Sequence, residues 1–526
     1  MTRFDDIPSL VASHAGDNRP ALTFYEGRTL AGSLSHGELC ERVEAAAGYL
    51  WESLGVRRGD RIALLSPNRL EVPVVMLAAM RLGAVIVPLN PAAPSEDWTY
   101  IAGHARARGC FASHELLSKV TIGSEAFVRP IDELARCRGR APAADPDLGS
   151  AMAVILYTSG TTGRPKGVVL AQQNLIANAW SMAWSLGMSG AVQLAVLPLY
   201  HAHALGFGLM TALTTRGHLV FTDRFDPFAW SEIIRAHEVA ITSVVPTLLP
   251  PLLQVRTTAE RVPSLRAILV SSAPLSAELA RDFEHRTRLP LLQGWGLSEY
   301  TNFACCMSPY EDPSTRDELM FGYEVPCIGG ALPGTEVRVV DATGNEALPG
   351  VRGELCVRGH STMLSYLDDP EGTSKTIDAD GWLRTGDEGF SVLHGGKRRF
   401  FVSGRIKEII IRGGEKHSPI ALERIITTAV PELAGRIAIL GFAHAVHGEE
   451  IGAYVEAEAT SDEVCARLAA ALDAMEGEQR PKIVLFGAQA IPRTHTGKVQ
   501  RRKLQPLFEP HAACRGPTQM ISLGQR

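Results

Sequence analysis

Short apolar runs alternate with amphipathic stretches along the first part of the chain. Between residues 39 and 54, apolar side chains recur every three or four positions, as they do on one face of an α-helix. Ser35 and Glu38 precede this stretch at the spacing of a capping box. The runs at 61–65 and 84–89 have the length and apolar content of buried strands. Helices that alternate with buried strands predict an α/β fold with a parallel sheet.

The pattern changes twice further along the chain. From about residue 327, short strand-like segments are separated by glycine turns, which predicts a β-rich subdomain. After Arg405 a compact unit begins with a helix that starts at Pro419. Further strands are expected at 151–157, 193–198, 219–222, 240–245, 267–270, 436–441, 450–457 and 482–486, and further helices at 174–186 and 461–475.

These changes predict two domains and a tail. Residues 1–404 are expected to form a large N-terminal domain of layered α/β subdomains plus the β-rich subdomain, and residues 405–509 a small, mobile α+β C-terminal domain. The charged residues Arg405 and Lys407 suit a solvent-exposed hinge between them, with Lys407 as the hinge residue. Residues 510–526 show no clear periodicity, so we expect them to form a mobile tail.

Composition and charge exclude several classes of function. The 45% hydrophobic and 21% charged fractions are those of an ordinary globular protein. With 57 acidic and 52 basic side chains the net charge is −5, so no positive field favours nucleic acid or anionic lipid as a partner. No apolar run reaches the roughly 18 residues of a membrane span. The nine scattered cysteines show no disulfide framework, which predicts a reduced, cytoplasmic protein.

The segment YTSGTTGRPKG at residues 157–167 directly follows a strand-like apolar run. Glycines let backbone N–H groups approach an anion, hydroxyls donate hydrogen bonds, and Lys166 adds positive charge, so this composition predicts a phosphate-binding loop. The loop lacks the Gly-Lys-Ser/Thr end of a Walker A motif. The residues expected at the phosphates are Thr158, Ser159, Gly160, Thr161, Thr162, Gly163 and Lys166.

This loop resembles that of the adenylate-forming superfamily, which includes acyl-CoA synthetases, luciferases and peptide-synthetase adenylation domains. Four further segments resemble motifs of that superfamily and follow in its order. They are QGWGLSE at 293–299, GWLRTGD at 381–387, GRIKE with GGE and SP between 404 and 419, and PRTHTGK at 492–498. Five ordered motifs over about residues 30 to 505 are far more specific than any single one.

The resemblance implies that the protein activates a carboxylate with ATP, and it gives individual residues a role. Glu299 would hold Mg²⁺, a hard cation that takes oxygen ligands. Asp387 and Arg405 would bind the ribose hydroxyls, and Trp295 would offer adenine an aromatic face. Lys498 would neutralise the carboxylate and α-phosphate oxygens in the transition state.

The same resemblance assigns the remaining site residues. His201, in the segment LPLYH, would lie between the carboxylate and the phosphates as a further catalytic residue. Gly294 and Ser298 belong to the nucleotide-binding motif that contains Trp295. Gly413 and Gly414 would let a phosphopantetheine arm pass close to the backbone.

Alignment of the motifs also places an acyl pocket. Relatives restricted to acetate have a Trp where Gly296 stands, so the pocket is expected to admit more than two carbons. Peptide-synthetase domains hold a substrate ammonium with an aspartate near residues 200–205, where this chain has none, which disfavours an α-amino acid. The residues expected to line the pocket are His203, Ser271, Ser272, Ala273, Gly296 and Asn302.

We therefore expect an AMP-forming acid–thiol ligase. A carboxylic acid and ATP would give an acyl-adenylate and pyrophosphate, and a thiol would then take the acyl group. The thiol is either coenzyme A or the phosphopantetheine arm of an acyl carrier protein, and a luciferase-like oxygenase is the alternative from another class. The expected cofactors are ATP, Mg²⁺ and coenzyme A, and the expected partner is a small carboxylic acid whose identity the sequence leaves open.

Overall fold

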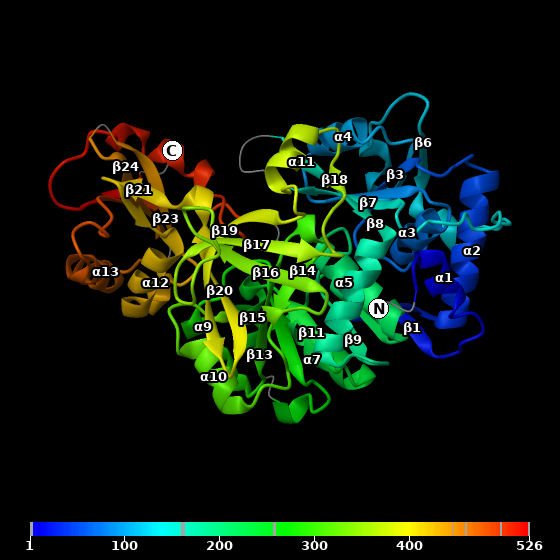
Figure 1. Cartoon of the computed structure of the whole chain (residues 1–526), viewed down its shortest axis with the longest axis horizontal. Helices are drawn as coiled ribbons and strands as arrows, with labels where there is room; N and C mark the ends of the chain where they lie inside the picture. The colour runs from blue at the N-terminus through cyan, green and yellow to red at the C-terminus, as the bar shows by residue number, and fades with distance from the viewer. Residues whose placement is uncertain are drawn as a thin grey trace.

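The computed structural model of the chain describes residues 4–158, 164–255, 259–444, 446–457, 460–494 and 497–523. The described residues form three sheets flanked by helices, and the last of the three makes a separate body at one end of the molecule (Figure 1). In this part of the chain no helix is long and apolar enough to cross a membrane. The α-helices are α1 (Ile7–Ala12), α2 (His36–Glu52), α3 (Glu71–Arg81), α4 (Ser95–His104), α5 (Gln172–Leu186), α6 (Thr211–Thr215), α7 (Pro227–His237), α8 (Leu249–Gln254), α9 (Ala277–Thr287), α10 (Pro313–Phe321), α11 (Pro370–Thr376), α12 (Pro419–Ala429) and α13 (Asp462–Ala474).

The first sheet confirms the α/β prediction. In spatial order its seven strands are β18 (Ser365–Tyr366), β8 (Lys166–Ala171), β7 (Met152–Thr158), β4 (Val85–Leu89), β3 (Arg61–Leu65), β5 (Gly109–Ala112) and β6 (Phe127–Pro130). The strands from β7 to β6 pair in parallel, whereas β8 and β18 pair antiparallel. α2 begins directly after Ser35, and the predicted capping box between Ser35 and Glu38 is present.

The second sheet joins the α/β and the β-rich parts of the large domain. In spatial order its thirteen strands are β16 (Thr335–Val340), β17 (Gly353–Gly359), β19 (Leu383–His394), β20 (Lys397–Arg405), β15 (Cys327–Ala331), β14 (Phe303–Cys306), β13 (Leu291–Gly296), β12 (Ala267–Val270), β11 (Ile241–Val244), β9 (Val192–Ala195), β10 (His218–Thr222), β1 (Pro20–Glu26) and β2 (Thr29–Ser35). The strands from β13 to β1 pair in parallel, and those from β14 to β16 pair antiparallel. The expected β-rich part therefore exists, but it continues the α/β sheet instead of forming a sheet of its own.

The third sheet forms the small C-terminal unit. Its strands are β22 (Glu415–His417), β21 (Ile410–Arg412), β24 (Gly448–Glu456), β25 (Ile483–Gly487) and β26 (Gln519–Ser522), with β23 (Ile437–His444) also paired to β24. The strands and helices expected after Arg405 are all present. The tail differs from the expectation, because residues 519–522 pair in parallel with β25. A four-residue edge strand has too few positions to show an alternation in the sequence.

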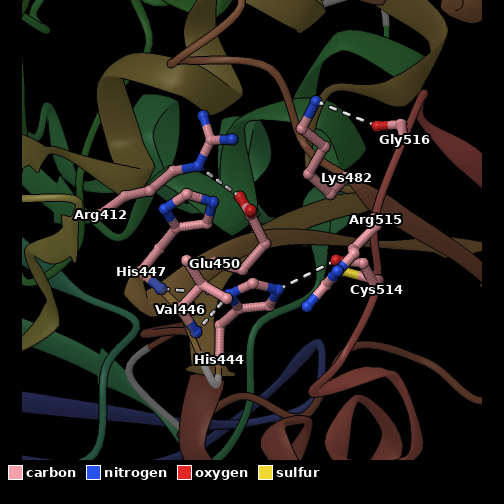
Figure 2. Close-up of a pocket in the computed structure, with 9 residues that line it drawn as sticks. All are labelled: Arg412, His444, Val446, His447, Glu450, Lys482, Cys514, Arg515 and Gly516. Carbon is pink, nitrogen blue, oxygen red and sulfur yellow. Dashed lines mark hydrogen bonds and ion pairs between the residues drawn. The ribbon is translucent and has the colours of Figure 1, made fainter.

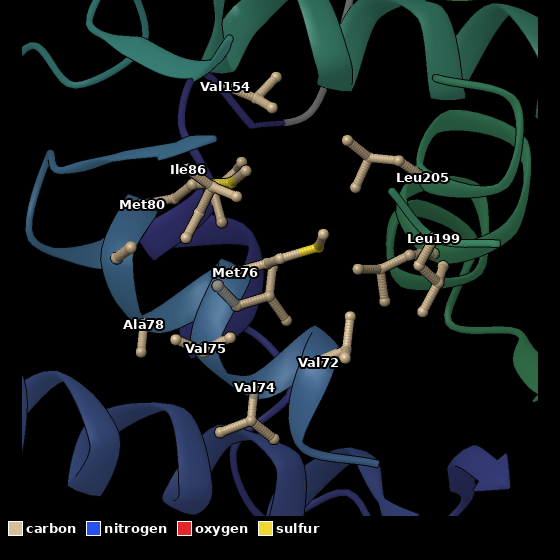
Figure 3. Close-up of a cluster of buried hydrophobic side chains, with 14 of the residues drawn as sticks. Val72, Val74, Val75, Met76, Ala78, Met80, Ile86, Val154, Leu199 and Leu205 are labelled. Carbon is tan, nitrogen blue, oxygen red and sulfur yellow. The ribbon is translucent and has the colours of Figure 1, made fainter. Parts of the chain in front are cut away.

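The core of the large domain supports the segment that carries His201 and His203. Met76 of α3 is fully buried, as are Leu199 and Leu205. Figure 3 shows the Met76 side chain pointing toward these two leucines, with Ile86 and Val154 of the first sheet on the other side. α3 thereby packs the first sheet against residues 199–205.

Two helical glycines have opposite surroundings. A Cβ atom on Gly48 of α2 would lie 2.1 Å from the carbonyl carbon of Gly139, so the backbone near residue 139 packs directly against the helix. A Cβ atom on Gly103 of α4 would have no neighbour within 4 Å. Alanine is a better helix former than glycine by about 1 kcal/mol. This gain is the same at both positions, so the effect of a glycine-to-alanine change should differ only through the packing around each one.

We predict opposite effects of the same substitution. Gly103→Ala should raise the melting temperature, because it gains helix propensity without a clash. Gly48→Ala should lower it, because the backbone at Gly139 would have to move. Thermal unfolding of both variants checks this, and stabilisation by Gly48→Ala would contradict the close approach.

Candidate active site

Asp387 is the centre of a buried polar cluster. Its side chain is 8% exposed, and the register of β19 and β20 places it opposite Arg405. Arg405 Nε lies 2.7 Å from Asp387 Oδ1, and the indole Nε1–H of Trp295 donates to Oδ2 at 2.9 Å. The charge of Asp387 raises the pKa of Arg405. Because a carboxylate offers about four acceptor sites, Asp387 keeps sites for ligand hydroxyls.

Trp295 has a function in the structure that its motif did not reveal. The side chain is only 8% exposed and packs in the hydrophobic cluster of the β-rich part. Most of the ring surface expected to face adenine is therefore covered by protein. Its hydrogen bond to Asp387 makes it a positioning residue for that carboxylate, and stacking on adenine stays a prediction.

Glu299 and Lys166 meet at Tyr366, which the sequence did not single out. Tyr366 O–H donates to Glu299 Oε1 at 2.9 Å, and burial raises the pKa of Tyr366, so the phenol keeps its proton. Lys166 Nζ lies 4.7 Å from the centre of the Tyr366 ring and 2.8 Å from Asp369 Oδ2. The pairing of β18 with β8 brings these segments together. No motif spacing signals this, because the two strands are about 200 residues apart.

Lys498 extends from the C-terminal unit toward this cluster. Burial lowers the pKa of Lys498, and the charge of Arg405 lowers it further. The carboxylates of Asp387 and Glu299 act in the opposite direction and raise it. The side chain is nevertheless exposed. Both observations fit a side chain that faces solvent-filled space surrounded by protein. The charge of Lys498 acts on three of the residues predicted to bind the nucleotide and its metal ion, namely Arg405, Asp387 and Glu299.

Residues of the C-terminal unit also approach the large domain away from this cluster. A Cβ atom on Gly497, next to Lys498, would lie 3.1 Å from Thr247 Cγ2 of the large domain. Thr428 Oγ1 of α12 donates to Glu278 Oε1 of α9 at 3.3 Å. Lys407 lies in a short 3₁₀ turn and is exposed, and its role as a hinge stays a prediction.

Gly413 and Gly414 lie elsewhere on the C-terminal unit. They form the exposed turn between β21 and β22, with φ of 58° and 94°. Gly413 N–H donates to the carbonyl of His447 at 3.1 Å. Positive φ values account for glycine at both positions.

The residues expected in the acyl pocket are drawn together around His203. The Nδ1 atom of His203 lies 2.9 Å from Ser271 Oγ and 3.2 Å from Ser272 Oγ. Ala273 follows the two serines. A Cβ atom on Gly296 would lie 1.7 Å from the carbonyl oxygen of Asn302, so no side chain fits at Gly296 with this backbone.

Other predicted residues lie at the edges of the site. Thr158 ends β7, whereas Ser159 to Gly163 lie outside the described residues. The ring of His201 lies 4.3 Å from that of Tyr200, centre to centre. Ser298 starts a 3₁₀ turn. A Cβ atom on Gly294 would lie 2.5 Å from the Phe303 ring, so Gly294 is needed for packing.

A separate pocket lies on the C-terminal unit beside the Gly413–Gly414 turn. It has a volume of about 430 Å³. Figure 2 shows Arg412, Lys482 and Arg515 around it, with Glu450 bound to Arg412 at 2.6 Å. His444 Nε2 contacts the Cys514 carbonyl at 3.0 Å, and its Nδ1 accepts from two backbone N–H groups. Since Arg412 neutralises Glu450 and both ring nitrogens of His444 are engaged, the pocket suits an anion better than a metal ion.

The comparisons with known proteins agree with this geometry. The family model described as "AMP-binding enzyme" matches residues 11–367. The chain belongs to the AMP-binding enzyme family. Two curated relatives are a 4-coumarate–CoA ligase-like protein of Oryza sativa subsp. japonica, 32% identical over 95% of this chain and 88% of the relative, and a sulfoacetate–CoA ligase of Cupriavidus necator, 31% identical over 95% and 97%.

The solved structures show the same fold over the whole length. MatB from Rhodopseudomonas palustris with bound ATP is 28% identical, covers 96% of this chain and 99% of its own, and superimposes with a TM-score of 0.83. The TM-score against apo MatB is 0.71. The predicted mixed α/β class with its large multi-sheet domain is therefore confirmed.

The predicted activity is confirmed at the level of reaction class. The protein is an AMP-forming acid–thiol ligase that activates a carboxylic acid as an acyl-adenylate. The relatives named above are CoA ligases. Their names therefore do not favour an acyl carrier protein as the acceptor, or a luciferase-like oxygenase as the activity.

We predict that Asp387→Asn weakens use of ATP while the protein stays folded. The change keeps the shape of the side chain but removes the charge that pairs with Arg405. Hydrogen bonds to charged groups contribute about 1.5–3 kcal/mol, so the KM for ATP should rise at least about tenfold. Steady-state kinetics with varied ATP check this.

The matched control is Asp282→Asn, which removes an exposed pair with Arg286 on α9. Exposed pairs contribute little, so its kinetics should not change. An Asp387→Asn enzyme with unchanged KM and kcat would show that Asp387 does not bind the nucleotide.

Proposed function

We propose that this chain is an ATP-dependent acyl-CoA synthetase in which the C-terminal unit completes the adenylation site. The observation that supports this most directly is the position of Lys498, whose charge acts on Arg405, Asp387 and Glu299. A nucleotide-binding protein without catalysis would not need a lysine supplied by a second domain. The higher TM-score against ATP-bound MatB than against apo MatB is consistent with this orientation.

In this proposal the large domain binds the nucleotide. Asp387, held by Trp295 and Arg405, accepts the ribose hydroxyls. Thr158 and the glycine-rich loop after it donate to the phosphates. Lys166 forms an ion pair with Asp369 that is partly exposed, with 40% and 35% of the two side chains accessible, so a polyphosphate can compete for this cation.

Glu299 fits the expected Mg²⁺ by its chemistry. It offers carboxylate oxygens, the ligands that this hard cation prefers, and Tyr366 fixes the orientation of one of them. The bound ion would supply positive charge against the phosphates. Tyr366 contacts both Glu299, the expected metal ligand, and Lys166. One side chain therefore connects the two groups that would place positive charge at the phosphates.

In the first step the acid carboxylate attacks the α-phosphorus and pyrophosphate leaves. Lys498 stabilises the negative charge that develops on the α-phosphate and carboxylate oxygens. Burial and Arg405 disfavour its charge in the free enzyme, so a bound polyphosphate and Lys498 stabilise each other. His201 lies at the start of the segment that leads into the acyl pocket and would orient the carboxylate.

We assign the thiol to coenzyme A. Besides the names of the relatives, the pocket in Figure 2 supports this, because Lys482 and Arg515 can hold phosphate groups close to the Gly413–Gly414 turn. In the second step the thiol attacks the acyl carbon and AMP leaves. For the turn to approach the adenylate, the C-terminal unit has to rotate at Lys407.

Three variants separate the two half-reactions. Lys498→Ala should block ATP–pyrophosphate exchange by at least 100-fold and still convert supplied acyl-adenylate to thioester. Gly414→Leu should do the reverse, because the side chain would obstruct the pantetheine path although nothing lies within 4 Å of a Cβ there in the present orientation. Since φ of 94° strains a leucine, thermal unfolding of this variant shows whether the C-terminal unit stays folded. Lys407→Pro fixes φ and should slow thioester formation more than exchange.

Single-turnover kinetics of each half-reaction, with a panel of carboxylic acids and with or without coenzyme A, is the measurement. If Lys498→Ala loses both steps equally, or Gly414→Leu spares thioester formation, the two-orientation proposal fails. If no carboxylic acid supports exchange in the unchanged enzyme, the proposed function itself fails.

A further inference from the structure

Uncharged hydrogen-bonding groups surround His203, one of the residues expected to line the acyl pocket. The His203 side chain is 6% exposed. Its ring meets Phe303 and Phe207 edge to face, with centres 5.2 and 6.0 Å apart. On its Nδ1 side lie the hydroxyls of Ser271 and Ser272. Two hydroxyls and two aromatic rings therefore fix the orientation of the histidine.

The hydrogen-bond pattern determines which ring nitrogen carries the proton. Besides each other, the hydroxyls of Ser271 and Ser272 have only His203 Nδ1 as a hydrogen-bonding partner among the described residues. Their protons are best satisfied when Nδ1 accepts, which leaves the proton on Nε2. That Nε2–H group is buried and has no hydrogen-bond partner in this part of the chain.

Asn302 supplies a second donor without a partner. Its side chain is 7% exposed, and its Nδ2 group has no hydrogen-bond partner among the described residues. A Cβ atom on Gly206 would lie 2.9 Å from Nδ2, so glycine there makes room for the amide. Buried donors are costly when unpaired, so each of these two N–H groups needs an acceptor that the described residues do not supply.

The backbone on both sides of this pocket is strained. Ser272 has φ of 71° and Thr301 has φ of 65°, a region that residues with a Cβ atom rarely adopt. His203 itself precedes a π-helical segment at residues 204–210, and such segments occur mostly at functional sites. Strain of this kind persists where it positions functional groups.

Charge is missing from the pocket. Burial lowers the pKa of His203 to about 3, and no charged neighbour contributes to that shift. The imidazole is therefore neutral at pH 7. A second carboxylate or a sulfonate here would be buried without a counter-charge, which is strongly unfavourable.

We propose that the acid substrate carries an uncharged hydrogen-bond acceptor, such as a ketone or ether oxygen, at the end remote from its carboxylate, and that His203 Nε2–H and Asn302 Nδ2–H bind it. This inference rests on the proposed function and narrows its substrate class. It disfavours plain hydrocarbon acids, which leave both donors unpaired, and dianionic acids, which bury a charge.

Matched trios of acids test the proposal by ATP–pyrophosphate exchange. An aliphatic trio is 4-oxopentanoate, 4-methylpentanoate and succinate, and an aryl trio is 4-acetylbenzoate, 4-isopropylbenzoate and terephthalate. In the trio that fits the pocket, the keto acid should exceed both partners at least tenfold in kcat/KM.

Two substitutions of His203 locate the effect. His203→Phe removes the donor and should reduce the ratio of keto to hydrocarbon acid to near one. His203→Gln keeps an N–H donor on a side chain of similar length and should keep most of the preference. Thermal unfolding of both variants shows whether the fold is intact, and the ratio within one enzyme cancels general losses of activity.

Preference for the hydrocarbon or the dianionic member in both trios would overturn the proposal, as would an unchanged ratio in a folded His203→Phe variant. These results leave the adenylation activity itself in place. Absence of exchange with every acid of both trios and of a wider carboxylic acid panel would instead contradict the proposed function.

Discussion

The ion pair of Asp387 with Arg405 is the interaction on which the rest of the site depends. A buried carboxylate is stable only when it is paired and hydrogen-bonded, and here one partner comes from β20 and the other from Trp295 of β13. The antiparallel β-rich part has to continue the parallel sheet for these three side chains to meet. The same arginine ends β20 at the boundary of the C-terminal unit, so the proposed nucleotide site and the proposed hinge would share one residue.

Charge is distributed unequally between the two domains. The large domain supplies carboxylates and a neutral acyl pocket, and the C-terminal unit supplies the cation Lys498 beside Arg405. Since burial and Arg405 disfavour the charged form of Lys498, the unit gains most from its present orientation when phosphates are bound.

The sequence predicted the residues whose chemistry depends on local spacing. The motifs around Asp387, Arg405 and Lys498 identified residues that the structure brings together, and the apolar periodicity predicted most strands and helices. Tyr366 and Asp369 could not be found, because only the pairing of β18 with β8 places them beside Glu299 and Lys166. The bond from Trp295 to Asp387 depends in the same way on the register of distant strands. β26 was missed because its pairing, not its pattern, makes it a strand.

The central claim is that the C-terminal unit, in the orientation described, is the adenylating one. Cysteines at Glu278 of α9 and Thr428 of α12, which are in contact, can be joined by a short bismaleimide, with each single-cysteine variant treated in parallel to account for the native cysteines. The cross-linked enzyme should keep ATP–pyrophosphate exchange and lose thioester formation. Loss of exchange, or thioester formation at the rate of the single-cysteine variants, would contradict the account.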